Sequence, residues 1–464
     1  MNRRDFVKLT LYSSVMAGLG LPSTRAFAAG PNRTLVNIMC LGGADFRYMF
    51  APNPSDADYA NKYWEARSQL YSGHASYSSA WGALYSATAA GFGIYNQAGW
   101  LKAQYDAGNV AIVCNVVGSE NRQHDHSQII INTGDLNASR FALDRDGWGG
   151  RLAEAIGAAN VVAMSHDISA FCKGTDPANR TAQVIHARDT RNFALSNGNN
   201  ATTQRVARAL KNYYKGKQLE ATNKPASWPY HKFIQHEQKL REFGDPFKAL
   251  TDANPIPAAL LDIADSSSPN RLNRLGFAKE CSNLYDSFTG AELFQLRVAA
   301  MEYGGWDTHR SQQSGFENNI SDLFGTNGGL ATLTNSLPAD VVNNTVFVFT
   351  TDFGRQLRAN GDNGTDHGTG NYMILIGPAV NGGVYGEMHP RREISTAEGP
   401  APFDVRGADI KGLTSFERVL SRLCNWVEPG SGIKVFPNMA YANLNTYPDG
   451  PILEPGVDLS NLLA

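Results

Sequence analysis

Short hydrophobic runs alternate with longer polar stretches along much of the chain. Runs rich in branched aliphatic and aromatic residues predict strands at Leu35–Leu41, Val110–Val117, Val161–Met164, Phe294–Met301, Val346–Thr350 and Tyr372–Ile376. Most of these runs are continuously hydrophobic, which is typical of strands covered on both faces. Stretches between and after them predict helices at Gly99–Ala107, Ala201–Tyr214, Trp228–Phe243, Ile320–Leu337 and Ser415–Val427. Strands that alternate with helices predict an α/β fold with a mainly parallel sheet and helices on both sides.

Two ranges depart from this alternation. Residues from about 165 to 290 are polar and rich in helix formers, which predicts a helical insertion or cap. Residues 378–414 are rich in Gly and Pro and predict a long loop near the ligand edge of the sheet. The middle of the helix predicted at Ile320–Leu337 contains glycines, so we expect a break there.

The first residues predict export. Arg3 and Arg4 precede a short hydrophobic stretch, Leu9–Leu21, and then Ala26-Phe27-Ala28. A paired arginine, a moderately hydrophobic core and a small-x-small cleavage site are typical of a twin-arginine signal, here residues 1–28. The alternative is a membrane anchor, but Leu9–Leu21 is shorter than the roughly 20 residues that a spanning helix needs. We therefore expect the Tat translocase as a partner, a periplasmic or secreted location, and no permanent membrane span.

Composition narrows the function classes. The formal net charge is −2, from 41 basic and 43 acidic residues, which gives no reason to expect nucleic acid as a partner. The five cysteines include no Cys-x-x-Cys pair; a disulfide between Cys172 and Cys281 stays open, because sequence does not set connectivity. The chain also lacks a Gly-x-Ser-x-Gly elbow, a phosphate-loop lysine motif, His-Glu-x-x-His and a dinucleotide fingerprint. These absences disfavour serine hydrolases, NTPases, zincins and Rossmann oxidoreductases.

Acidic and imidazole side chains follow several predicted strands. Asp307 and His309 come after a Gly-Gly turn, Asp352 follows Val346–Thr350, and Asp366 and His367 lie in a glycine-rich segment. Open α/β sheets place ligand-binding groups at the carboxyl ends of their strands, and Asp with His binds zinc, manganese or calcium. The alternative for Asp307 and His309 is a turn with a capping Asp and an exposed His. The alternative for the glycine-rich segment is an ordinary flexible turn.

Three further segments carry candidate groups. Arg355 offers a fork of donors suited to a phosphate or sulfate oxyanion, although a structural pair with Asp352 is the competing interpretation. Asp45 follows Leu35–Leu41. After Val110–Val117 the chain supplies a cation, imidazoles and hydroxyls that predict part of a site, or alternatively a solvated loop: Arg122, His124, His126, Ser119 and Ser127.

Six motifs in this order resemble a known family. They are Gly-Gly-x-Asp after the first strand, Arg-x-His after the second, Gly-Trp-x-Gly-Arg, Gly-Gly-Trp-Asp-Thr-His, Asp-Phe-Gly-Arg and Gly-Thr-Asp-His-Gly. Together they resemble a poorly characterised family of Tat-exported bacterial proteins, a domain of unknown function related to the alkaline phosphatase and sulfatase superfamily. The resemblance covers nearly the whole of residues 29–464. It implies an alkaline phosphatase-like α/β/α sandwich with a metal site at the strand ends.

The resemblance also implies roles for particular residues. By superfamily analogy the metal ligands would be Asp45, Asp307, His309, Asp352 and His367, with Arg355 or Arg122 near the oxyanion. The chain departs from the pattern where Phe353 follows Asp352 in place of a ligand histidine, where Asn121-Arg122-Gln123-His124-Asp125 replaces Ser-Arg-Ser-His-Phe, and where no sulfatase nucleophile motif occurs.

Two functions follow as hypotheses. The first is an exported metal-dependent hydrolase of phosphate or sulfate esters, with a small-molecule or glycan ester as substrate and zinc, manganese or calcium as cofactor. In it Arg355, Arg122, His124 and Ser127 are the candidate catalytic residues, and Asp366 joins the metal ligands named above. The second is a non-catalytic envelope binding protein that keeps the phosphatase-like fold.

Overall fold

The computed structural model describes residues 32–437, with gaps, and residues 457–464. The larger gaps cover most of 193–242 and parts of 390–413. The predicted signal, residues 1–28, and the helices predicted at Ala201–Tyr214 and Trp228–Phe243 lie largely or wholly outside the described residues.

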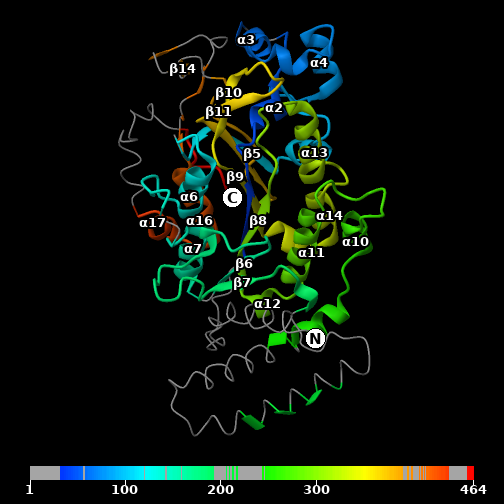
Figure 1. Cartoon of the computed structure of the whole chain (residues 1–464), viewed down its shortest axis with the longest axis vertical. Coiled ribbons are helices and arrows are strands. Elements are labelled where there is room, and N and C mark those ends of the chain that lie inside the picture. The colour runs from blue at the N-terminus through cyan, green and yellow to red at the C-terminus, as the bar shows by residue number, and fades with distance from the viewer. Residues whose placement is uncertain are drawn as a thin grey trace.

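A nine-stranded mixed sheet forms the centre of the described structure (Figure 1). Its main path runs in the order β13-β5-β12-β9-β1-β8-β6-β7, and β17 pairs with β5. The strands are β1 (Thr34–Cys40), β5 (Val110–Val117), β6 (Asn160–Ala163), β7 (Val184–His186), β8 (Leu296–Tyr303), β9 (Thr345–Thr351), β12 (Asn371–Ile376), β13 (Gly383–Tyr385) and β17 (Thr414–Ser415). All six predicted strands are confirmed. The prediction of a mainly parallel sheet is also confirmed, with β12 as the exception because it runs antiparallel to both β5 and β9.

Helices cover both faces of the sheet (Figure 1). The described helices are α2 (Phe46–Met49), α3 (Asp58–Ala66), α4 (Tyr77–Leu84), α5 (Gly99–Asp106), α6 (His124–Thr133), α7 (Trp148–Ile156), α10 (Ala258–Ala264), α11 (Leu275–Thr289), α12 (Ala291–Phe294), α13 (Gln312–Phe324), α14 (Gly329–Ser336), α15 (Ala339–Asn343), α16 (Phe416–Val427) and α17 (Ser431–Val435). Short 3₁₀ helices are η2 (Ser68–Tyr71), η3 (Ala170–Cys172) and η4 (Thr190–Asn192). The helix predicted at Ile320–Leu337 is split into α13 and α14 at Gly325–Gly328, as its glycines indicated.

The continuous hydrophobicity of the central strands follows from this layering. In β1, Val36 and Ile38 enter one core, while Leu35 and Met39 enter the core on the opposite face. The first core also contains residues of α11, α13 and α14, and the second contains residues of α7, α16 and α17. Because alternate side chains of one strand are buried on both sides, both sets of positions are mostly hydrophobic. The buried polar exception in the middle of β1, Asn37, accepts a hydrogen bond from the Thr350 hydroxyl at 3.0 Å.

Three smaller sheets lie outside the main sheet in the described structure. They are formed by β2 (Phe50–Pro52), β3 (Tyr85–Ala87) and β4 (Phe92–Tyr95), by β10 (Gly354–Ala359) and β11 (Thr365–Gly368), and by β14 (Ile394–Thr396), β15 (Gly399–Pro400) and β16 (Asp409–Ile410). The range 378–414 therefore holds short strands where a loop was predicted. One of them, β13, joins the main sheet because it pairs in parallel with β5.

The range from about 165 to 290, predicted as a helical insertion, contributes to the main sheet and to its cover. Strand β7 pairs in parallel with β6 at the edge of the sheet. Helix α11 places Phe277 and Leu284 in the core that β8 shares. All five cysteines are buried and free, so no disulfide links Cys172 to Cys281.

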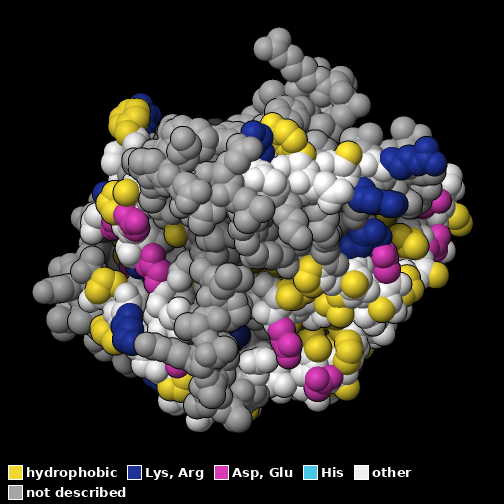
Figure 2. All heavy atoms as spheres, turned by 90° about the horizontal axis from the view of Figure 1, so that it is seen from below, with side chains coloured by type: hydrophobic (Ala, Val, Ile, Leu, Met, Phe, Trp, Pro, Cys, Tyr) yellow, Lys and Arg dark blue, Asp and Glu magenta, His cyan; other side chains and the backbone are white. Residues whose placement is uncertain are grey.

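The surface gives two further facts. Among the described residues, no helix is both long enough and hydrophobic enough to cross a membrane. Seen from below, the described surface mixes hydrophobic side chains with Asp and Glu, and Lys and Arg gather toward one side (Figure 2). This end of the molecule lies away from β10 and β11, which are near the top of Figure 1.

Candidate metal centre

Three parallel strands end side by side and bring distant segments together. Cys40 at the end of β1 lies opposite Tyr303 of β8 and Thr351 of β9. The backbone contact continues beyond the sheet, because Trp306 N donates to the carbonyl oxygen of Leu41 at 3.1 Å. The segments that follow the three strands therefore meet at one edge, as the carboxyl ends of parallel strands do in open sheets.

The Gly42-Gly43 turn makes this close approach possible. Both residues have positive φ, +117° and +72°. A Cβ atom on Gly42 would lie 2.4 Å from Asp307 N, and one on Gly43 would lie 2.6 Å from the ring of Phe353. Glycine is required because a side chain would need both a rare backbone conformation and space that its neighbours already fill.

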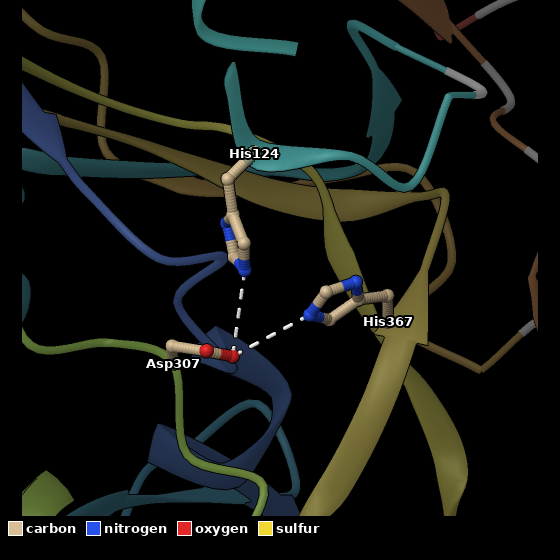
Figure 3. Close-up of side chains that lie close together, drawn as sticks. All are labelled: His124, Asp307 and His367. Atoms are coloured by element: carbon tan, nitrogen blue, oxygen red, sulfur yellow. Dashed lines mark hydrogen bonds and ion pairs between the residues drawn. The ribbon is translucent and has the colours of Figure 1, made fainter. Parts of the chain in front are cut away.

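Three side chains from this region point toward one another (Figure 3): His124 at the start of α6, Asp307 after β8, and His367 of β11. Asp307 Oδ1 lies 3.5 Å from His124 Nε2 and 3.4 Å from His367 Nε2. Their potential ligand atoms all lie within 4.8 Å of one another. We call these three residues the candidate metal group.

Fixed hydrogen bonds orient both imidazoles of the candidate metal group. His124 Nδ1 lies 2.7 Å from Asp352 Oδ2, and His367 Nδ1 lies 2.8 Å from the carbonyl oxygen of Arg122. A carbonyl oxygen accepts only, and so does an ionised carboxylate, so each Nδ1 carries the proton. Each Nε2 then directs its lone pair toward the centre of the group. In metal sites of proteins, an acceptor at one ring nitrogen commonly orients the other ring nitrogen of a histidine toward the metal in this way.

Asp352 is fully buried and holds His124 from behind. Its Oδ2 also accepts from Gly42 N at 3.1 Å and from Gln128 Nε2 at 3.2 Å. Its other oxygen, Oδ1, and His124 Nε2 are buried and have no hydrogen-bond partner among the described residues. A buried polar atom without a partner costs free energy, and such atoms in native structures often mark a bound group.

Arg355 is fully buried beneath the group. Its guanidinium donates to the carbonyl oxygens of Gly43 at 2.8 Å, Thr365 at 2.8 Å and Gly42 at 2.5 Å. It also donates to Asp307 Oδ1 at 2.7 Å. Arg355 thus fixes both the glycine turn and the Asp307 carboxylate, and its donors are directed to protein acceptors.

His309 and Asp366 extend the group on its exposed side. His309 Nε2 lies 2.8 Å from His367 Nε2 and 3.2 Å from Asp307 Oδ1. His309 Nδ1 lies 3.1 Å from Asp366 Oδ1, and that oxygen also accepts from Asn360 Nδ2 at 3.0 Å. The side chain of His309 is partly exposed, so a ligand in solution can reach it.

Electrostatics keep Asp307 ionised. Burial raises its pKa, but the hydrogen bond and charge of Arg355, helped by His309 and His124, outweigh burial and lower the pKa below its ordinary value. The hydrogen bond to Asp352 raises the pKa of His124, and burial opposes it. For His367, burial and the charges of Arg355 and His124 lower the pKa against its hydrogen bond to the Arg122 carbonyl. An ionised carboxylate and a neutral imidazole are the forms that bind metal ions.

The remaining predicted site residues lie elsewhere or face other partners. Asp45 is buried and pairs with Arg67 at 2.6 Å and with Gln312 at 2.8 Å. Arg122 pairs with Asp409 at 2.9 Å, and its side chain is 42% exposed.

The predicted hydroxyl candidates turn inward. Ser127 is buried, and its hydroxyl donates to Ser119 Oγ at 3.0 Å and to the carbonyl oxygen of Asn121. His126 likewise faces protein, with Nε2 2.7 Å from the carbonyl oxygen of Ala138.

Two residues that the sequence analysis did not select as site residues lie beside the site: Phe353 and Asp409. The Phe353 ring packs against His124 and His367, with ring centroids 4.8 and 4.4 Å apart. Asp409, from a range predicted as loop, binds both Arg122 and the backbone of Thr369. Phe353 follows Asp352 directly, so its place beside the group was available from sequence, whereas nothing in the sequence linked Asp409 to Arg122.

The donor set fits a transition metal or zinc better than calcium. Two imidazole nitrogens and one carboxylate oxygen are typical of zinc and manganese sites, whereas calcium takes six to eight oxygen ligands. Three protein ligands also correspond to an open site with positions left for water or substrate.

The fold and the site define an α/β protein with a mainly parallel mixed sheet and a histidine–carboxylate group at its strand ends. The sequence matches the family described as "Protein of unknown function (DUF1501)" over residues 32–398, which is most of the chain. The protein therefore belongs to that family. No curated protein gives a significant match to the sequence.

Proposed function

We propose that the protein is a metal-dependent hydrolase of phosphate or sulfate esters, with the candidate metal group as its centre. The observation that carries the proposal is the pair of oriented imidazoles. His124 and His367 are each held at Nδ1 by an acceptor, so both Nε2 lone pairs and Asp307 Oδ1 converge. Three electron-rich atoms at this spacing repel one another unless a cation, or a proton, lies between them.

The chemistry divides between the bound ion and the chain. A divalent cation would polarise the ester oxygen and lower the pKa of a water molecule. His309, whose Nδ1 is held by Asp366, is placed to give a proton from Nε2 to the leaving oxygen. In the balanced reaction, the water oxygen bonds to phosphorus or sulfur while the bond to the ester oxygen breaks, and that oxygen leaves as an alcohol with the proton from His309. Of the two protons of the attacking water, one restores His309 and the other stays on the phosphate product or passes to bulk water from sulfate.

The two arginines have different roles in this proposal. Arg355 donates to backbone carbonyls and to Asp307, so it positions the ligand carboxylate and does not contact substrate. Arg122 is partly exposed and engages Asp409 through Nη2. Its remaining donors make it the better candidate for binding a phosphate or sulfate oxygen.

Water is the nucleophile that the arrangement favours. The Ser127 hydroxyl is buried and donates to Ser119 and Asn121, so it does not face the candidate metal group. A direct attack by water needs no covalent intermediate on the protein, unlike attack by a serine hydroxyl.

The first test is metal content. Wild type and the variants His124→Ala, Asp307→Ala and His367→Ala would be reconstituted with zinc, manganese or calcium and measured by elemental analysis. We expect stoichiometric metal in wild type and loss in each variant, because each removes one of three ligands. His166→Ala is the matched control, since that side chain is 71% exposed and contacts Asp167. Absence of metal from reconstituted wild type would overturn the proposal.

The second test is turnover. Aryl phosphate and aryl sulfate esters would be assayed with the metal-loaded protein, and we expect hydrolysis that falls at least about 100-fold when one ligand is lost. Metal binding without hydrolysis of either ester class would reject the hydrolase.

A non-catalytic binding protein is the second candidate. The observation in its favour is the use of Arg355 by protein acceptors, which removes one cation that a phosphatase would direct at its substrate. In that case the metal would hold a glycan or protein partner, and metal content without ester hydrolysis is its expected signature.

Export is part of the same proposal. The paired Arg3 and Arg4 support folding before Tat export and a periplasmic or secreted location. Replacing both by lysine should leave the protein in the cytoplasmic fraction. Export of that double variant would reject the twin-arginine assignment.

A further inference from the structure

A cavity lies on the side of the sheet that α7 and α16 cover. It has a volume of about 190 Å³. Its walls come from the end of α6 at Thr133, from Asp135 and Asp146 in the following loop, from Glu417 in the first turn of α16, and from Phe436 just after α17. None of these residues belongs to the candidate metal group.

Glu417 is the feature of this cavity that needs an explanation. The residue is 5% exposed, and its Oε2 atom has no hydrogen-bond partner among the described residues. Burial, with the charge of Asp135 added, raises the pKa of Glu417 to about 7, and Arg151 opposes the rise. A buried carboxylate oxygen without a partner is costly, so a ligand that donates to it would be stabilising.

The arginines beside the cavity donate no hydrogen bond to Glu417 Oε2, although the charge of Arg151 lowers the pKa of this carboxyl. Arg151 donates to Asp146 Oδ2, to the carbonyl oxygen of Val435 and to the carbonyl oxygen of Thr133, each at 2.7 Å. Arg145 pairs with Asp135. The donors of Arg145 and Arg151 are thus directed to other acceptors, and Arg180 also lies 3.8 Å from Asp146 Oδ1. Glu417 Oε2 is left without a donor among the described residues.

Backbone adds to the negative character of the cavity. Helix α6 ends at Thr133, beside the cavity, and the carboxyl end of a helix carries partial negative charge. Phe436 and Pro437 supply an apolar wall. The cavity therefore combines a buried carboxyl oxygen that has no donor among the described residues, a helix carboxyl terminus and a hydrophobic surface.

We propose that this cavity binds a small organic cation with a primary ammonium group. The ammonium would donate to Glu417 Oε2, and its carbon chain would lie against Phe436 and Pro437. A metal ion fits less well, because the described Asp, Glu, His and Cys groups converge in metal-binding geometry only at His124, Asp307 and His367. This site is independent of the proposed hydrolase centre.

The test uses the folded protein with ethylammonium as the probe. Calorimetric titration should show saturable binding to wild type and at least about tenfold weaker binding to Glu417→Gln, because glutamine has no charge. Glu428→Gln, at the other end of α16 with a 42% exposed side chain, is the matched control and should bind like wild type. Tetramethylammonium, which has no N–H donor, should not compete.

Two results would overturn the proposal. The first is that wild type does not bind ethylammonium even at a concentration of about 50 mM. The other is equal binding to Glu417→Gln.

If Glu417→Gln does not fold, the proposal is tested on wild type by NMR, which measures the pKa of the Glu417 carboxyl with and without ethylammonium. Bound ethylammonium should lower the pKa of the Glu417 carboxyl, with Asp135, Asp146, Arg145 and Arg151 as the other charged groups that face the cavity. An unchanged pKa at saturation would then reject the site.

Discussion

Asp45 and Asp307 follow neighbouring parallel strands and come after the same kind of Gly-Gly turn, yet the fold uses them differently. Asp307 is 48% exposed and faces the imidazoles of His124, His309 and His367, with Arg355 behind it. Asp45 is buried and bound to Arg67, and Gln312 donates to the same oxygen at 2.8 Å. A carboxylate at a strand end therefore becomes a candidate ligand only when its other neighbours leave an oxygen directed outward.

The largest expected effect comes from breaking the buried pair. Asp45→Ala leaves the fully buried Arg67 guanidinium without its carboxylate, and we expect a loss of about 3–5 kcal/mol of unfolding free energy. Urea denaturation measures it. Asp106→Ala is the control, because that side chain is 55% exposed in its pair with Lys102. A loss below about 1 kcal/mol would show that the pair is not structural.

The pH dependence of this pair has a definite sign. Burial raises the pKa of Asp45, but Arg67 and Gln312 outweigh burial, so the folded-state pKa lies below the unfolded one. The stabilisation is therefore present above the unfolded pKa and is lost as the pH falls through the folded pKa. Asp45→Ala should lack this part of the acid sensitivity.

The next effect concerns the candidate metal group. Asp352→Asn keeps the size of the side chain but removes the charge that holds the His124 proton on Nδ1, so metal affinity should fall about 10–100-fold. Competition with a chelator measures the affinity. Asp167→Asn, whose side chain is 89% exposed, is the control. Unchanged affinity would mean that His124 is not a ligand.

A smaller effect is expected where the two regions share the glycine turn. Gly43→Ala adds a Cβ 2.6 Å from the Phe353 ring at a φ of +72°, and we expect a loss of about 1–3 kcal/mol. Gly73→Ala is the matched control, because a Cβ there meets nothing within 4 Å. Equal unfolding midpoints for the two variants would contradict the requirement for glycine.

The smallest expected effect concerns Glu280, a partly buried acid that, unlike Asp45, is not paired with an arginine among the described residues. Burial raises the pKa of Glu280 to about 8, the Glu302 N–H lowers it, and the Glu302 charge raises it. The folded state then keeps a proton that the unfolded state loses, so stability falls as pH rises from about 4.5 to about 8.

Glu280→Gln should remove this decline. Above pH 8 we expect it to be about 1–2 kcal/mol more stable than wild type, a gain reduced because the Glu280 residue is only partly buried. Denaturation at several pH values measures it, with the exposed Glu65→Gln as control. Parallel pH profiles for wild type and Glu280→Gln would contradict the assignment.

Sequence pattern was sufficient for the central strands and, among the described helices, for α5, α14, α16 and the end of α13. Val110–Val117 is predicted and observed with the same bounds, because a strand buried on both faces is hydrophobic at most positions. Its one polar residue, Asn115, is buried and accepts a hydrogen bond from Arg47 at 3.0 Å. Strand β7 and strand β13 were not predicted, since each has three residues and gains its place by pairing at the sheet rather than by local pattern.

The candidate site was predicted in part. Asp307, His124 and His367 were each chosen from motifs, but the motifs did not distinguish them from Asp45, whose partner Arg67 lies 22 residues further along the chain. The sequence also suggested Arg355 as an oxyanion binder. In the structure its donors meet the carbonyls of a turn more than 300 residues away, a contact that no local pattern encodes.

By itself the sequence determined the α/β class, the positions of six strands of the main sheet and the residue types gathered at the strand ends, because periodicity and composition are local properties. Only the tertiary structure decided which carboxylate faces imidazoles and which faces a buried arginine. The cause is that hydrogen-bond direction and burial depend on neighbours brought together by strand register, as at Cys40, Tyr303 and Thr351.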